Sequence, residues 1–98
     1  MNERKIKETL KRCLEDAYWR GFYDKAPSEN CRRYIALIFY RSDYAEELKK
    51  NEWNRAEVNG EMEALEEEMD LTDWRYLREH AQDDEFIEKC EEFIYGLS

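Results

Sequence analysis

The longest apolar run in the chain, residues 34–40, decides the fold class: it reads Tyr34-Ile35-Ala36-Leu37-Ile38-Phe39-Tyr40. Seven consecutive apolar residues fit either a buried strand or a buried helix. A strand needs a partner strand, yet Val, Ile and Thr together number only eight and no second such run exists. Cys31 and Leu48 also extend a helical stripe. We therefore predict a helix from Ser28 to Lys50, interrupted near Ser42. The alternative is a strand that pairs with a second copy of itself.

Helical spacing is equally clear before this run. From Glu3 to Tyr23, apolar residues recur every three or four positions, which is the spacing of one helix face. The following residues, 24–28, form the clearest break in the pattern. Pro27 suits a first helical position, and Ser28 suits an N-cap. One helix is therefore expected before the break and another after it.

Signals for helix ends continue through the second half of the chain. Asn59-Gly60 predicts a turn, and Thr72 is the expected N-cap of the helix that follows it. Asp83 or Asp84 is expected to cap a last helix, whose apolar stripe is the cleanest in the chain. The sequence thus predicts an all-α fold, a compact bundle of five or six short helices in a single domain over residues 1–98.

Composition narrows the class of protein further. Charged residues make up 42% of the 98 residues and the formal net charge is −9, whereas Leu, Ile, Val and Phe total only 18. The 7 Tyr, 3 Trp and 3 Met supply much of the remaining apolar surface that a core needs. Such a composition excludes a membrane span, a disulfide scaffold and a low-complexity chain.

The cysteines and the N-terminal residues point to a reducing compartment. Cys13, Cys31 and Cys90 are odd in number and widely spaced, and each falls at an apolar position of a helical pattern. We predict that they are small buried hydrophobic residues. No apolar run typical of a secretory signal follows the charged N-terminal residues, so we expect a cytoplasmic protein.

Charge is unevenly distributed along the chain. Residues 1–50 hold 12 basic and 9 acidic side chains, whereas residues 51–98 hold 4 basic and 16 acidic ones. One stretch within the second half contains no base and eight acids: Glu57, Glu61, Glu63, Glu66, Glu67, Glu68, Asp70 and Asp73. We predict that these eight residues form a binding surface for a basic protein.

Repulsion within the acidic stretch is the reason for this prediction. Glu63 and Glu67, and likewise Glu66 and Asp70, are like-charge pairs at i,i+4, each unfavourable by roughly 0.2–0.5 kcal/mol. Their Cβ atoms would lie about 5–6 Å apart on a helix, a spacing of the same order as that of charges along a nucleic-acid strand. An acidic helix can therefore occupy a basic groove built for phosphates. Replacing these four acids with Gln is expected to stabilise the isolated protein or leave its stability unchanged, while abolishing inhibition of the partner.

Some small phage-encoded inhibitors, including anti-CRISPR proteins and other DNA mimics, act in this way, which makes them an analogy for the expected function. The partner would be a basic, nucleic-acid-handling protein. The alternative is a homo-oligomeric helical protein, with a homodimer as its simplest form, in a structural or regulatory role. Its acidic face would then be only a solvent-exposed surface.

Aromatic residues divide into expected core and expected anchors. Trp53 and Tyr44 are the predicted anchors beside the acidic stretch, since Trp and Tyr are enriched in interface hot spots. Five others are expected in the core: Trp19, Phe22, Phe39, Phe86 and Phe93.

No residue pattern indicates catalysis, a metal site or a cofactor. His80 is the only histidine and is expected at a surface or a helix end, because its neighbour Glu79 points elsewhere on a helix. The sequence contains no P-loop, no G-x-G-x-x-G and no C-x-x-C. We therefore expect a non-enzymatic protein without cofactors. Its net charge disfavours direct nucleic-acid binding, and the mixed charges of the first helix disfavour membrane binding.

Overall fold

The computed structural model describes residues 3–43, 45–50 and 52–97. Its helices are α1 (Glu3–Glu15), α2 (Ala17–Asp24), α3 (Glu29–Asp43), α4 (Ala45–Lys50), α5 (Glu52–Glu68), α6 (Leu71–His80) and α7 (Asp84–Leu97). The predicted all-α bundle is confirmed. Residues 34–40 lie within α3, so the helical interpretation of the apolar run is confirmed as well. In the part of the chain described here, no helix is both long and apolar enough to cross a membrane.

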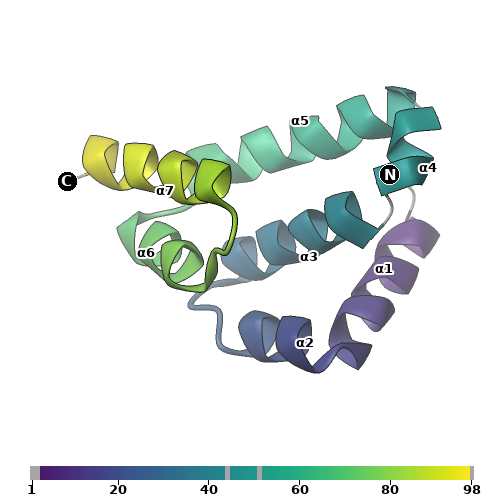
Figure 1. Cartoon of the computed structure of the whole chain (residues 1–98), viewed down its shortest axis with the longest axis horizontal. Helices are drawn as coiled ribbons and strands as arrows, with labels where there is room; N and C mark the ends of the chain where they lie inside the picture. The colour runs from purple at the N-terminus through teal and green to yellow at the C-terminus, as the bar shows by residue number, and fades with distance from the viewer. Residues whose placement is uncertain (1–2, 44, 51, 98) are drawn as a thin grey trace.

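Helix α3 runs through the centre of the molecule (Figure 1). Helix α5 lies along one side of it, and α1 and α2 lie along the other. Helices α6 and α7 pack against each other and close the end of the molecule at which α5 ends. The Ser28 hydroxyl donates a hydrogen bond to Asp73 Oδ1 over 2.7 Å, which ties the start of α3 to α6.

The core forms around α3 because its apolar residues face every neighbouring helix. Tyr34, Ile35 and Tyr40 are at most 1% exposed. The other fully buried side chains come from α1, α3, α5, α6 and α7: Cys13, Cys31, Val58, Trp74, Leu77 and Cys90. Burial of all three cysteines confirms their predicted place among the apolar residues.

The five aromatic residues expected in the core all reach it, to different depths. Phe22 and Phe39 are buried, whereas Trp19, Phe86 and Phe93 are partly buried. Phe93 stacks on the buried Trp74 with ring centroids 4.1 Å apart and an interplanar angle of 6°. Aromatic pairs thus supply packing that the few aliphatic residues cannot supply alone.

The helix predicted from Glu3 to Tyr23 is divided in two, which corrects the sequence-based expectation. Asp16 has an extended backbone, with φ −86° and ψ 121°, and its side chain accepts hydrogen bonds from the backbone of Tyr18 and Trp19. A carboxylate that bonds the following backbone N–H groups competes with the helix interior and starts a new helix instead. Asp16 is therefore the N-cap of α2.

The turn predicted at Asn59-Gly60 is wrong, because both residues lie inside α5. A glycine in a helix interior costs only about 1 kcal/mol relative to alanine. Val58 and Met62, on either side of the dipeptide, are 0% and 4% exposed. Burial of that apolar face outweighs the local preference for a turn.

Two predicted caps are confirmed and one is wrong. Ser28 Oγ accepts from the backbone N–H of Cys31 at 3.1 Å, and Asp83 Oδ1 accepts from that of Phe86 at 3.2 Å. Thr72, in contrast, is an exposed residue in the first turn of α6.

The N-cap of α6 is Asp70 instead of Thr72. Asp70 Oδ1 accepts from the backbone N–H of Asp73 at 3.0 Å, and Asp73 Oδ2 accepts from that of Asp70 at 3.1 Å. This capping box satisfies two otherwise unpaired backbone donors at once. A threonine two residues later has no equivalent pair to offer.

The assignment of Asp70 as the N-cap of α6 predicts a large effect for one substitution and a small effect for another. Asp70→Ala removes the capping oxygen and should lower the free energy of unfolding by about 1 kcal/mol. Thr72→Ala should change it by less than about 0.5 kcal/mol, as an ordinary surface substitution does. Urea denaturation followed by circular dichroism measures both, and a larger loss for Thr72→Ala than for Asp70→Ala would overturn the assignment.

Candidate functional site

Three of the eight acids predicted as a binding surface stabilise the fold. Glu66 is 9% exposed and Asp73 is 4% exposed. Asp70 is exposed but caps α6. Asp73 completes that cap and also accepts a hydrogen bond from the Ser28 hydroxyl. These carboxylates serve as hydrogen-bond acceptors inside the molecule.

Glu66 joins three helices. Its Oε1 accepts a hydrogen bond from the Tyr34 hydroxyl of α3 at 3.0 Å and forms an ion pair with the Lys89 ammonium of α7. Burial, followed by the charge of Glu66 and the hydrogen bond to it, raises the pKa of Tyr34 above its usual range. The carboxylate is thus held between a neutral donor and a cation, as a buried charge requires.

The other five acids lie on two different sides of α5. Glu61 and Glu68 line an open groove with Leu10 of α1 and Arg33 of α3. Glu63 and Glu67 follow Glu66 around the helix by roughly 60° and 100°, so they lie on the exposed side of α5, away from this groove. The last, Glu57, is half-buried. The structure therefore does not bring all eight predicted residues together.

Helix α7 contributes acids that the sequence analysis missed. Residues 83–92 contain six acids and one base, a charge signal comparable to that of α5, whereas the predicted binding surface ends at Asp73. Lys89 marks the side of α7 that faces α5. Glu85 and Glu92 lie one turn away from it, and Glu88 lies next to it along the outer surface.

Five acids of α5 and α7 on either side of the Glu66–Lys89 contact are here called the α5–α7 acidic face: Glu63, Glu67, Glu85, Glu88 and Glu92. All five are exposed. Within the described residues, none of them makes a hydrogen bond or an ion pair. Other exposed acids do find partners, since Glu91 pairs with Arg78 at 3.0 Å and Glu8 pairs with Arg4 at 3.8 Å.

The acidic face lacks a local cation because Lys89 is already engaged. Lys89 lies between the two helices, yet its ammonium turns inward to Glu66. Glu85, four residues before it, is left without that partner, although Glu-to-Lys at i,i+4 is the favourable order on a helix. The negative potential of the face is therefore not cancelled by the one base of α7.

The predicted aromatic anchors are not tested. Tyr44 lies outside the described residues, and only the backbone of Trp53 is described, in α5. Both remain predictions.

An aromatic cleft adjoins the acidic face and was not predicted. It has a volume of about 580 Å³ and lies between α2, α3 and the start of α7. Phe22, Tyr34 and Met62 are its buried floor, and Trp19 and Phe86 form its walls. These residues are distant in sequence, so no local pattern could have revealed the cleft.

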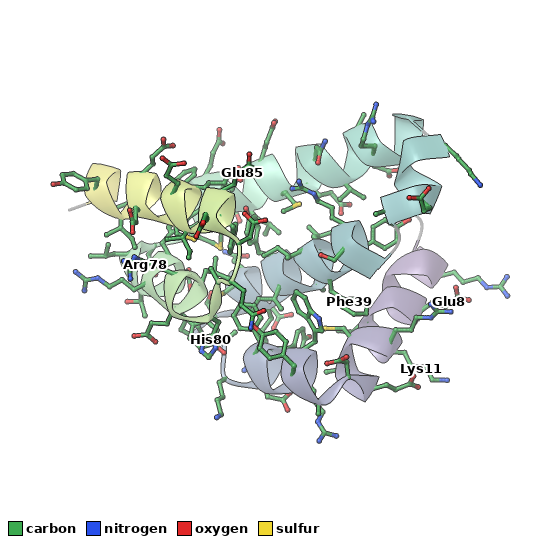
Figure 2. The ribbon with its side chains drawn as sticks, in the orientation of Figure 1. Glu8, Lys11, Phe39, Arg78, His80 and Glu85 are labelled. Atoms are coloured by element: carbon green, nitrogen blue, oxygen red, sulfur yellow. The ribbon has the colours of Figure 1, made fainter. Side chains whose placement is uncertain are left out.

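His80 ends α6 and lines this cleft, which confirms its predicted place at a helix end. Its ring lies 4.9 Å from that of Phe22 and 4.6 Å from that of Tyr76, between ring centroids. The Tyr18 hydroxyl donates to the His80 carbonyl at 2.9 Å. The histidine thus packs the α6–α7 turn against α2 (Figure 2).

Comparisons with known proteins add no function to this geometry. No protein-family model, no curated protein and no solved structure matches the chain.

Burial predicts that the three thiols are unreactive. Desolvation, the largest cause in each case, raises the pKa of Cys13 and Cys90 to about 11 and that of Cys31 to about 12. Because the thiolate is the reactive form, a disulfide reagent near neutral pH should label none of them until the chain unfolds in urea. Rapid labelling of one cysteine in the folded protein would contradict this.

The same shifts predict a loss of stability at high pH. The folded chain keeps its thiol protons to a higher pH than the unfolded chain, whose thiols ionise near 9.0. The stability that the folded chain gains from its protonated thiols is therefore complete below pH 9 and is lost as the pH rises towards 11 to 12. Urea denaturation at successive alkaline pH values should show a falling midpoint, and a midpoint that rises over this range would exclude the effect.

The ion pair between Glu66 and Lys89 predicts that replacing Lys89 alone lowers the free energy of unfolding more than replacing both residues. Lys89→Met leaves a buried carboxylate without its cation and should lower the free energy of unfolding by about 1–3 kcal/mol. Adding Glu66→Gln, which keeps an acceptor for Tyr34 without the charge, should recover part of that loss. A double-mutant cycle by urea denaturation measures the coupling, and a value near zero would mean that the pair contributes nothing.

Proposed function

We propose that this protein binds a basic protein through the α5–α7 acidic face and blocks the groove in which that partner holds nucleic acid. It would act in the cytoplasm as a DNA mimic, in the manner of phage-encoded anti-defence inhibitors such as anti-CRISPR proteins. The observation that carries the proposal is the set of exposed carboxylates on α5 and α7 that have no partner among the residues that the structure describes.

The negative charge and the exposed position of the acids on α5 and α7 support this function. Buried acids of the chain have partners, such as Lys89 and Tyr34 for Glu66. The acids of the face have none within the described residues, so a partner that brings lysine or arginine would relieve their repulsion. Association would be steered by charge and weakened by salt.

The structure changes which residues test the proposal. Glu66 and Asp70 make contacts that stabilise the fold, so replacing Glu63, Glu66, Glu67 and Asp70 with Gln should lower the stability of the isolated protein, contrary to the sequence-based expectation. The acids of α7 take the place of Glu66 and Asp70 in the experiment.

A homo-oligomer is the second candidate, and one observation favours it. Tyr95 is 87% exposed and Leu97 is 49% exposed, both at the end of α7. A second copy that covered these side chains would bury apolar surface that a small domain leaves exposed. Light scattering distinguishes the candidates, since the first predicts a monomer before its partner is added.

The test replaces acids of the face without touching the core. We expect the variant E63Q/E67Q/E88Q/E92Q to lose a partner that the wild-type protein captures from its cells of origin at low salt. The captured protein should bind duplex DNA, and the wild-type chain should displace that DNA in a fluorescence anisotropy assay. The variant should need at least about tenfold more protein for the same displacement.

A matched control keeps the net charge of that variant. The set E8Q/E15Q/D24N/E79Q changes the same number of exposed acids outside the face and should displace DNA as the wild-type protein does. Equal displacement by both variants would show that the face is not the binding surface. Equal loss by both would show that only the total charge matters.

A further inference from the structure

The cleft beside the acidic face has the composition of a site for one inserted side chain. Its volume of about 580 Å³ falls in the range typical of binding pockets, which are mostly apolar with a few polar groups. A third of the residues that line it are aromatic: Tyr18, Trp19, Phe22, Tyr34 and Phe86. Tyr18 and Trp19 meet edge to face with ring centroids 5.7 Å apart. Tyr18 is 46% exposed, so the cleft is open to an incoming group.

Two basic and two acidic side chains line the cleft. Arg41 and Lys89 line it from α3 and α7. Lys89 is neutralised by Glu66, while Arg41 rests against the Met62 sulfur at 3.5 Å and pairs with no carboxylate among the described residues. Asp83 and Glu85 line it at the start of α7, and both are exposed.

The mouth is continuous with the acidic face. Glu85 lines the cleft and also belongs to the α5–α7 acidic face. Figure 2 shows Glu85 in the first turn of α7, on the side toward α5, and His80 at the end of α6. A partner that contacts Glu85 and Glu88 therefore reaches the cleft without leaving the acidic surface.

We propose that the cleft receives an aromatic side chain of the basic partner, flanked in the partner's sequence by lysine or arginine. This rests on the proposed function and specifies the partner at that same surface. The aromatic ring would be the anchor, and the flanking cations would contact Glu85, Glu88 and the carboxylates next to them.

The rings and the charged side chains that line the cleft favour this occupant. A guanidinium or ammonium inserted among the rings would be repelled by Arg41 and Lys89, whereas a neutral ring would pack on Trp19, Phe22 and Phe86. At the exposed rim the preference is reversed, because Asp83 and Glu85 of the lining, with Glu88 beyond them, attract cations and repel acidic flanks. An aromatic residue between basic residues satisfies both conditions.

Short peptides test this without the natural partner. The probes are capped pentapeptides KKFKK, KKAKK, KKRKK and EEFEE, titrated to millimolar concentration into the ¹⁵N-labelled full chain. We expect KKFKK to bind at least about tenfold more tightly than the other three. It should also shift the Trp19 indole N–H signal but leave that of the buried Trp74 unchanged.

A variant that fills the cleft separates insertion from simple charge attraction. Ser42 is exposed and lines the cleft, so Ser42→Tyr adds a ring there without removing any core residue. It should reduce KKFKK binding to the level of KKAKK. The matched control is Thr72→Tyr, which adds the same side chain at an exposed position outside the cleft and should change nothing.

Each outcome has a definite meaning. If KKFKK and KKAKK bind equally, or if none of the peptides binds, the cleft is not an anchor site, while the displacement assay still decides the role of the acidic face. Tighter binding of KKRKK identifies a cation as the occupant and overturns the proposal. Equal binding of EEFEE removes the need for basic flanks and overturns it also. Retained binding in Ser42→Tyr places the ring elsewhere.

Discussion

The contact between Glu66 and Lys89 governs both the fold and the surface of this protein. A buried carboxylate at the junction of α3, α5 and α7 needs a cation and a hydrogen-bond donor, and Lys89 and Tyr34 provide them. Lys89 is also the one base of α7. Its inward orientation stabilises the helix junction and leaves Glu85, Glu88 and Glu92 of α7 without a neutralising partner among the described residues. Because Lys89 pairs with the buried Glu66, it does not neutralise the exposed acids of α7.

The helices could be predicted from sequence wherever one face is continuously apolar, as in residues 34–40 and in the last helix. Predictions failed where a local polar contact or a buried face decided the outcome. Asp16 bonds two backbone N–H groups and divides a helix. Asp70 and Asp73 form a reciprocal cap that outcompetes Thr72. At Gly60, burial of the neighbouring Met62 maintains a helix despite a turn signal.

The candidate site could be predicted only in part, because charge along the sequence does not reveal charge in space. Local periodicity placed Glu63 and Glu67 on one helix surface, but it gave no means of knowing that Glu66 is buried by Tyr34 from 32 positions away. The acids of α7 join the surface through a contact between helices, and the aromatic cleft is assembled from distant segments. A small acidic chain thus combines structural carboxylates with exposed ones in the same stretch, and only packing separates the two groups.

The exposed acids of the α5–α7 acidic face are expected to repel one another, because no cation among the described residues pairs with them. Urea denaturation of E63Q/E67Q/E88Q/E92Q at low ionic strength tests it most directly. We expect a free energy of unfolding equal to that of the wild-type protein or higher by up to about 1 kcal/mol, with the difference shrinking as salt is added. A variant less stable than the wild type by more than about 1 kcal/mol would contradict the claim, because those carboxylates would then be stabilising the fold.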